Sequence, residues 1–212
     1  MKPNISKKIK NIIFDFGGVI CNIDHLIPEK KFKAMGIRDF DIMYSQAIQN
    51  NLFENLEKNL ISPQVFRKNL KLLIGRNISD EQIDEAWNSI ILDIPKSRID
   101  LLKKLKNQYR IFLLSNSNII HYNVFIEEFR LKSGLKDFSY LFEKTWFSFD
   151  LKMRKPDKEI YEFVLKDGNL KPEETLFIDD SIQNIKPAED LGIKCVFLDG
   201  DMDILKLFDL QN

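Results

Sequence analysis

Short apolar runs that end in polar residues recur along this chain of 212 residues, and such runs are typical of buried strands. The first is Ile12-Ile13-Phe14, which is followed by the carboxylate of Asp15 and then by Gly17-Gly18. Four later runs have the same mixture of β-branched, aliphatic and aromatic residues: Tyr109–Ser115, Glu143–Ser148, Thr175–Ile178 and Cys195–Leu198. The pattern therefore predicts five strands.

Helical patterns fill the segments between these runs. From about residue 25 to residue 93 no strand pattern occurs. Ser62-Pro63 marks one helix start in this stretch and Gly75 ends that helix, while Ser79-Asp80-Glu81-Gln82 is a capping box that starts another. From residue 95 onward strands and helices alternate, which predicts a parallel sheet with covering helices. We expect an α/β fold with a helical segment inserted after the first strand.

Three of the predicted strands end in polar side chains that could react or bind a ligand. These are Asp15, Ser115 and the pair Asp179-Asp180. Taken alone, Asp15 fits a residue that caps the next turn as well as it fits a functional acid. The carboxyl ends of adjacent parallel strands meet at one edge of a sheet, where open α/β sheets bind their ligands. The convergence of the three ends favours the functional interpretation.

Composition limits the classes of partner. Lysine plus arginine and aspartate plus glutamate each number 32, so the zero net charge gives no general attraction to nucleic acid or to an anionic membrane. Residues 1–10 are basic but lack the apolar core of a signal peptide, and no apolar stretch approaches membrane-spanning length. Cys21 and Cys195 lie in apolar contexts, which favours free thiols. We expect a cytoplasmic monomer or homodimer that acts on a small molecule.

Carboxylates gathered at one sheet edge repel one another unless one takes up a proton or a cation neutralises them. Oxygen-only ligands favour Mg²⁺. Lys155 lies in a basic turn at residues 152–156 and could hold a phosphate. Ser115, with the backbone N–H groups of Asn116 and Ser117 at a helix start, could bind an anion. A carboxylate, a hydroxyl, a lysine and a metal together suggest phosphoryl transfer through an aspartyl-phosphate.

Four segments carry a family resemblance: IIFDFGGVI, LLSNSN, RKP and FIDDSIQNI. They resemble, in order, the four motifs of the haloacid dehalogenase (HAD) superfamily of hydrolases. The longer runs around them are similar to the bacterial α-glucose-1-phosphate phosphatases and to the N-terminal phosphatase domain of soluble epoxide hydrolases. The resemblance implies a Rossmann-like catalytic core with helices on both faces of a parallel sheet, formed by residues 1–24 and 94–212. It also implies that residues 25–93 are a helical cap.

The resemblance also assigns roles to individual residues. Asp15 would be the nucleophile that becomes phosphorylated, and Lys155 would neutralise the nucleophile and the phosphoryl group. Ser115 and Asn116 would bind the phosphoryl oxygens of a small phosphorylated substrate. The groups implied as holding Mg²⁺ are Asp15, the backbone carbonyl of Gly17, Asp180 and, in support, Asp179.

One position departs from the family pattern. Most phosphatases of this superfamily carry a second aspartate two residues after the nucleophile as general acid/base, and here that residue is Gly17. General acid–base catalysis is worth about 10²–10⁴-fold, so its loss favours good leaving groups, as in sugar 1-phosphates and acyl phosphates. Alternatively, Asp24 or His25 could substitute, although Asp24 also fits a turn or capping residue. His121 could contact the substrate or simply pack. Asn184, at a position often acidic in relatives, could hold a water of the metal shell.

Two other functions stay open. A haloacid dehalogenase, which forms an aspartyl ester, would suit Gly17 because a halide leaves without a proton. The acids Asp179-Asp180 favour a metal, however, which dehalogenation does not use, and GGVI differs from the corresponding dehalogenase run. A non-catalytic HAD-fold binding protein is disfavoured by the intact set of nucleophile, hydroxyl, lysine and metal-binding acid. The sequence therefore favours a magnesium-dependent phosphatase.

Overall fold

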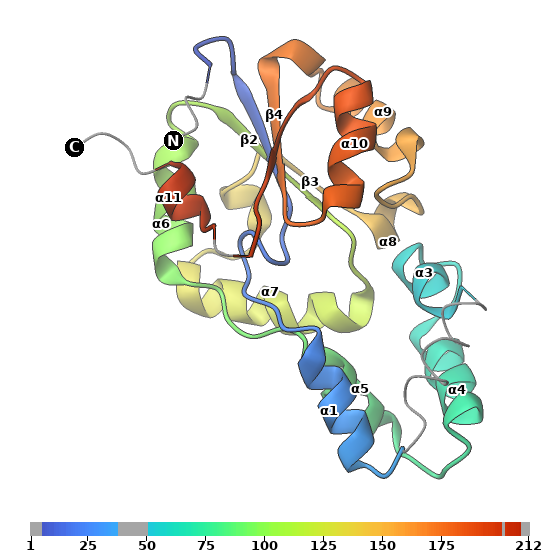
Figure 1. Cartoon of the computed structure of the whole chain (residues 1–212). Helices are drawn as coiled ribbons and strands as arrows, with labels where there is room; N and C mark the ends of the chain where they lie inside the picture. Colours follow the sequence, from blue (N-terminus) through green and yellow to red (C-terminus); the bar gives the residue numbers. More distant parts are fainter. Residues whose placement is uncertain (1–5, 38–50, 201, 209–212) are drawn as a thin grey trace.

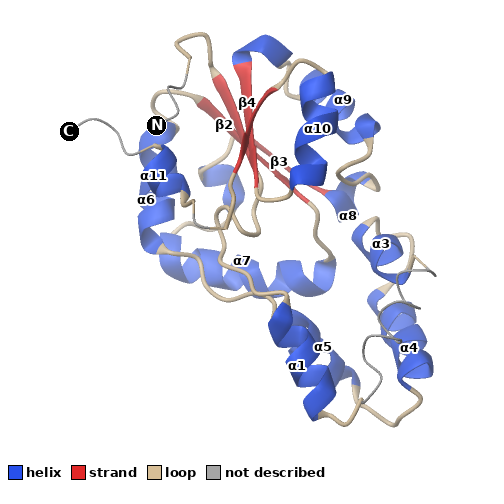
Figure 2. Cartoon of the chain, in the orientation of Figure 1, coloured by secondary structure: helices blue, strands red, loops and turns tan. Residues whose placement is uncertain are grey.

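The computed structural model describes residues 6–37, 51–200 and 202–208, and a parallel sheet of five strands forms its centre (Figures 1 and 2). The strands are β1 (Asn11–Phe14), β2 (Arg110–Ser115), β3 (Lys144–Phe147), β4 (Thr175–Asp179) and β5 (Lys194–Phe197). Their order is β3-β2-β1-β4-β5, and every pairing is parallel. The five predicted strands are confirmed, with ends shifted by single residues.

Successive strand residues face opposite sides of the sheet, and helices cover both sides (Figure 2). Ile12 and Phe14 belong to one buried cluster and Ile13 to another. On the side of Ile12 lie α6 (Lys96–Leu105), α7 (Ile119–Ser133) and α11 (Ile204–Leu207), and on the other side lie α9 (Lys158–Asp167) and α10 (Ile182–Asp190). The shorter elements are α8 (Ser148–Leu151) and two 3-10 turns, Phe138–Tyr140 and Pro172–Glu174. The predicted α/β architecture is confirmed.

Within the described residues, four further helices form a group at the carboxyl end of the sheet (Figure 1). These insert helices are α1 (Leu26–Ala34), α3 (Leu52–Glu57), α4 (Pro63–Ile74) and α5 (Asp80–Asn88). Phe32, Leu56, Phe66 and Ile83, one from each helix, lie in one buried cluster. The insert helices therefore have an apolar core of their own. Residues 38–50, part of the predicted helical segment, lie outside the described residues.

The helix starts predicted in this segment are present. The Ser62 hydroxyl accepts a hydrogen bond from the Val65 backbone N–H, and Gly75 ends α4 with a φ of 67°. Ser79 and Gln82 make both hydrogen bonds of a capping box at the start of α5. Local capping chemistry thus determines where these two helices begin.

The segments that enter and leave the insert helices run side by side. The Asn22 N–H donates to the Asp93 carbonyl (2.8 Å), and the Leu92 N–H donates to the Asn22 carbonyl (3.0 Å). Ile23 and Ile91 form an antiparallel bridge in between. Ile120 of α7 also packs into the apolar cluster of the insert helices. In the part of the chain that the structure describes, no helix has the length and apolar character needed to cross a membrane.

Candidate active site

The structure brings most of the predicted site residues around one cavity of about 1100 Å³, which lies between the carboxyl ends of the strands and the insert helices. The predicted residues that line it are Asp15, Gly17, His25, Ser115, Asn116, Ser117, His121, Lys155, Asp180 and Asn184. Asp179 is fully buried behind this wall. The parallel register explains the convergence, because β1 lies between β2 and β4 and all three end at the same edge.

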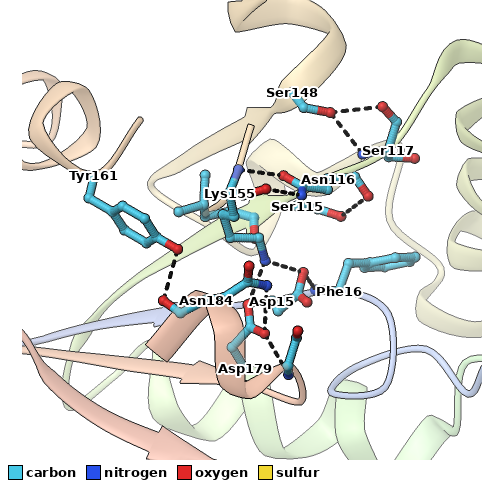
Figure 3. Close-up of polar contacts among 12 residues, drawn as sticks. Asp15, Phe16, Ser115, Asn116, Ser117, Ser148, Lys155, Tyr161, Asp179 and Asn184 are labelled. Carbon is cyan, nitrogen blue, oxygen red and sulfur yellow. Dashed lines mark hydrogen bonds and ion pairs between the residues drawn. The ribbon is translucent and has the colours of Figure 1, made fainter. Parts of the chain in front are cut away.

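Lys155 is the central cation of the site (Figure 3). Its ammonium lies 2.8 Å from Asp15 Oδ1 and 2.6 Å from Asp179 Oδ2, and it donates a third hydrogen bond to the Leu114 carbonyl at 3.1 Å. Only 1% of Lys155 is exposed. An ammonium group has three donors, and all three are directed at fixed acceptors. Lys155 is therefore held rigidly beside the predicted nucleophile.

The site carries more negative charge than Lys155 can balance. Asp15, Asp179 and Asp180 each offer a carboxylate oxygen within 4.8 Å of the others. Burial raises the pKa of Asp15 above its ordinary value, the Lys155 ammonium partly lowers it, and the two other carboxylates raise it again. Burial and Asp179 also raise the pKa of Asp180. A divalent cation would relieve this repulsion, and an all-oxygen ligand set fits Mg²⁺.

Asp179 and Asp180 differ in whether their carboxylate oxygens already have hydrogen-bond partners. Asp179 Oδ1 accepts from the Ser181 N–H (2.8 Å) and the Asn184 amide (2.9 Å), while Oδ2 contacts Lys155. Both Asp179 oxygens thus have partners, so this side chain positions the lysine. The Asp180 carboxylate accepts from no other residue among those described, which leaves it open to a cation. Asn184 is itself held by Tyr161, whose hydroxyl donates to the Asn184 carbonyl at 2.9 Å.

The loop after β2 is tied to the loop that carries Lys155. The Asn116 amide donates to the Lys155 carbonyl (2.8 Å), and its Oδ1 accepts from the Lys155 N–H (2.9 Å). The Ser117 N–H donates to Ser148 Oγ at 2.9 Å, so this N–H is not available to an anion and the prediction for it was wrong. Ser115 Oγ makes a single long contact, 3.4 Å to the Asn116 carbonyl. The Ser115 hydroxyl and the Asn116 N–H remain available as hydrogen-bond donors.

The two glycines after Asp15 have different structural requirements. Gly18 has a φ of 69°, and a Cβ at this position would lie 1.9 Å from Asp180 Oδ2. Only glycine therefore lets the Asp180 carboxylate approach this turn. Gly17 needs no positive φ, but a Cβ there would lie 3.3 Å from Ile23 Cδ1, which is a tight contact. The sequence pattern distinguishes Gly17 but not Gly18, because a close approach between distant segments leaves no local signal.

His121 lies where helix α7 meets the insert helices. Its Nδ1 lies 2.8 Å from Asn88 Oδ1, and its ring stacks on Trp87, which stacks in turn on Phe53. Burial lowers the pKa of His121 to about 3, so the imidazole is neutral near pH 7. His121 is placed to contact a substrate rather than to donate a proton. Trp87 and Phe53 also line the cavity, although aromatic residues at helical spacing are more often core residues.

Asp24 and His25 occupy the segment that enters the insert. Asp24 Oδ1 accepts from the Leu26 N–H at 2.8 Å, which caps the start of α1, and Asp24 is not among the residues that line the cavity. His25 does line it. The structure thus places His25, and not Asp24, on the same cavity as Asp15.

Comparison with known proteins agrees with this geometry. A family model described as haloacid dehalogenase-like hydrolase matches residues 9–192. A D-ribitol-5-phosphate phosphatase from Bacteroides thetaiotaomicron is 34% identical over 188 residues, which are 88% of this chain and 90% of the relative. The rat bifunctional epoxide hydrolase 2 is 44% identical over 46 residues, 22% of this chain and 8% of that protein, so this likeness is confined to one segment.

A solved structure extends the likeness to three dimensions. It is a HAD family enzyme from Bacteroides thetaiotaomicron in complex with magnesium and inorganic phosphate, with a TM-score of 0.85 and 39% sequence identity. The superposition covers 94% of this chain and 99% of that one. Since sequence and structure match over almost the whole chain, the protein belongs to the haloacid dehalogenase-like hydrolases.

Proposed function

We propose that the protein is a magnesium-dependent phosphatase that acts on a small phosphorylated metabolite through a phosphorylated aspartate. One observation carries the proposal: the buried Lys155 ammonium fixes Asp15 next to the open carboxylate of Asp180. The relative described as a phosphatase and the structure solved with magnesium and phosphate support it.

The side chains support a two-step displacement. The Asp15 carboxylate attacks phosphorus, an aspartyl-phosphate forms, and the bond from phosphorus to the leaving oxygen breaks. Lys155, the Ser115 hydroxyl and the Asn116 N–H hold the phosphoryl oxygens. Water then hydrolyses the acyl phosphate and releases inorganic phosphate. Asp15, Asp180 and the Gly17 carbonyl, with Asp179 in support, would hold Mg²⁺. Its positive charge would reduce the repulsion between the Asp15 carboxylate and the phosphoryl group.

Removal of the metal is the first test. In a chelator we expect phosphatase turnover to fall by about 100-fold or more, because Lys155 alone leaves the carboxylates and the phosphoryl group uncompensated. Release of inorganic phosphate is measured with and without chelator, and added Mg²⁺ is expected to restore the rate. Unchanged turnover in chelator would contradict the proposal.

Gly18→Ala tests the position of Asp180. The added Cβ clashes with Asp180 Oδ2, so we expect the Mg²⁺ concentration needed for half-maximal activity to rise about 10–100-fold. Backbone strain is expected to lower the free energy of unfolding by about 1–3 kcal/mol. Gly134→Ala is the matched control, because Gly134 has the same φ of 69° but nothing within 4 Å of the new Cβ. Equal Mg²⁺ dependence in the two variants would refute the role of Gly18.

We further propose that residues 25–93 act as a cap that selects the leaving group, on a core of residues 1–24 and 94–212. Phe53, Glu57 and Trp87 of the insert helices line the cavity together with the catalytic residues. Gly17 favours substrates whose leaving group departs without a proton. The phosphatase relative, by contrast, is described as acting on D-ribitol 5-phosphate, an ester of a primary alcohol. A polyol phosphate is therefore the second candidate substrate.

A substrate panel separates the two candidates. Since no acidic side chain stands at Gly17, we expect sugar 1-phosphates and acyl phosphates to exceed sugar 6-phosphates in kcat/KM by about 10²-fold or more, the usual value of a general acid. D-ribitol 5-phosphate completes the panel. If the primary esters are hydrolysed faster, a group other than residue 17 protonates the leaving oxygen. His25 is then the first residue to mutate.

A further inference from the structure

An ion pair lies in the wall of the cavity at the junction between core and insert helices. Arg154 Nε donates to Glu57 Oε2 at 2.8 Å. Glu57 is the last residue of α3, and Arg154 directly precedes Lys155. Both side chains are about three-quarters buried, with exposed fractions of 24% for Glu57 and 28% for Arg154, and both line the cavity.

Each partner of this pair keeps unused hydrogen-bonding capacity. A guanidinium group has five N–H donors, and the Nε contact uses one. Within residues 6–37, 51–200 and 202–208, the Arg154 Nη nitrogens and Glu57 Oε1 have no hydrogen-bond partner. The cavity wall therefore presents donors and an acceptor next to each other. A hydroxyl group both donates and accepts, so a carbon chain with adjacent hydroxyls matches this arrangement.

A second ion pair nearby already joins the same elements. Lys58 follows Glu57 and contacts Asp157 at 3.1 Å, as well as Glu54 at 2.7 Å. Neither Lys58 nor Asp157 lines the cavity. Docking of α3 on the core thus does not require a pair inside the cavity. Burial also raises the pKa of Glu57, which shows that its position there is unfavourable for a carboxylate. These two facts point to a role in binding.

The position relative to Lys155 fixes what the pair could contact. Consecutive Cα atoms are about 3.8 Å apart, so Arg154 begins one residue from the lysine that would neutralise the phosphoryl group. The charge of Lys155 also lowers the pKa of Glu57, although less than Arg154 does, so the two groups are within electrostatic reach. Because Glu57, Arg154 and Lys155 line the same cavity, a group bonded to the phosphoryl oxygen could reach this pair.

We infer that Glu57 and Arg154 bind hydroxyl groups of the leaving group, and that the substrate is a phosphate ester of a polyhydroxylated carbon chain or sugar. This rests on the proposed phosphatase function and makes its substrate class more specific. The two residues are specificity determinants, and neither takes part in the displacement at phosphorus.

The test compares two esters that differ only in their hydroxyls, a pentitol 5-phosphate and pentyl phosphate. In Glu57→Gln we expect the ratio of kcat/KM for the two esters to fall by about 10–100-fold, mainly through KM, because a hydrogen bond to a charged group is lost. Calorimetric binding of both esters to the Asp15→Asn protein, with and without Glu57→Gln, gives the same ratio without turnover. If no ester is hydrolysed but the binding ratio falls, the phosphatase proposal fails and the hydroxyl contact stands.

A charge exchange separates binding from docking. The double variant Glu57→Arg/Arg154→Glu keeps an ion pair but reverses donor and acceptor. We therefore expect its Tm to match that of the wild type, while the kcat/KM ratio of the two esters stays as low as in Glu57→Gln. Lys58→Met is the matched control and is expected to leave the ratio unchanged. If Glu57→Gln leaves the ratio unchanged, or if the double variant restores the ratio together with Tm, the pair only docks the insert and the inference is overturned.

Discussion

Asp15→Asn is expected to abolish phosphatase turnover while leaving the fold intact. The amide is nearly isosteric with the carboxylate but cannot attack phosphorus, and deletion of a covalent nucleophile costs about 10⁶-fold in a well-studied hydrolase. We therefore expect a loss of at least about 10⁴-fold in kcat, measured as phosphate release. The wild-type contact between Asp15 Oδ1 and Lys155 is 2.8 Å, and an amide oxygen can still accept it.

Two measurements distinguish loss of the nucleophile from loss of the fold. Circular dichroism and Tm show whether the variant is folded, and a single-turnover experiment shows whether a phosphorylated protein accumulates. Asp24→Asn is the control, because Asp24 caps α1 outside the cavity lining. If Asp15→Asn keeps more than about a tenth of the wild-type rate, Asp15 is not the nucleophile.

Lys155→Met is expected to have the largest effect on stability. Lys155 and Asp179 are 1% and 0% exposed, so solvent does not screen their ion pair. Removing one partner of a buried pair leaves an uncompensated charge and costs about 3–5 kcal/mol. We expect the free energy of unfolding, measured by denaturant titration in chelator, to fall by this amount. Lys158→Met is the control, because the Lys158–Glu162 pair is largely exposed and screened by solvent, so its loss is expected to leave the free energy of unfolding almost unchanged.

The stability loss in Lys155→Met is expected to depend on pH. Burial already raises the pKa of Asp15, and loss of the ammonium raises it further in the folded state. A carboxyl whose pKa is higher in the folded than in the unfolded state takes up its proton first in the folded state as pH falls. Since the pKa of wild-type Asp15 is raised to about 8, the difference from wild type is expected to be smaller near pH 7 than near pH 9.5, where only the wild-type carboxyl is largely ionised. A constant difference across this range would show that Lys155 acts by packing alone.

The sequence predicted the parts of the site that depend on topology. A β-branched and aromatic run followed by Asp15 marks a strand end, and alternation of strands and helices implies a parallel sheet. Parallel strands bring Asp15, Ser115 and Asp179 to one edge whatever the detailed packing. Topology alone does not bring Lys155 to this edge, because it lies on a loop. The basic turn at residues 152–156 and the resemblance of RKP to a family motif both pointed to it.

Contacts between distant segments were not predictable in the same way. The hydrogen bond that occupies the Ser117 N–H is accepted by the Ser148 hydroxyl. Ser148 was expected to end a strand, but it begins α8. The pair of Glu57 and Arg154 depends on how α3 sits against the core, and hydrophobic periodicity specifies only the apolar face of a helix. Side-chain chemistry and topology thus predicted which side chains meet at the sheet edge, while the contacts between the insert helices and the core required the three-dimensional structure.

The paired segments around Asn22 and Leu92 have a consequence for how such an enzyme diversifies. Hydrogen-bonded neighbouring chains lie about 5 Å apart, so the insert joins the core through two nearly coincident points. The entropic free-energy cost of closing a loop between such points rises slowly, by about 0.6 kcal/mol for each doubling of the loop length. A whole helical segment can therefore be exchanged, shortened or extended by recombination while the sheet keeps its reacting groups in place. One catalytic scaffold can in this way acquire specificity for different substrates.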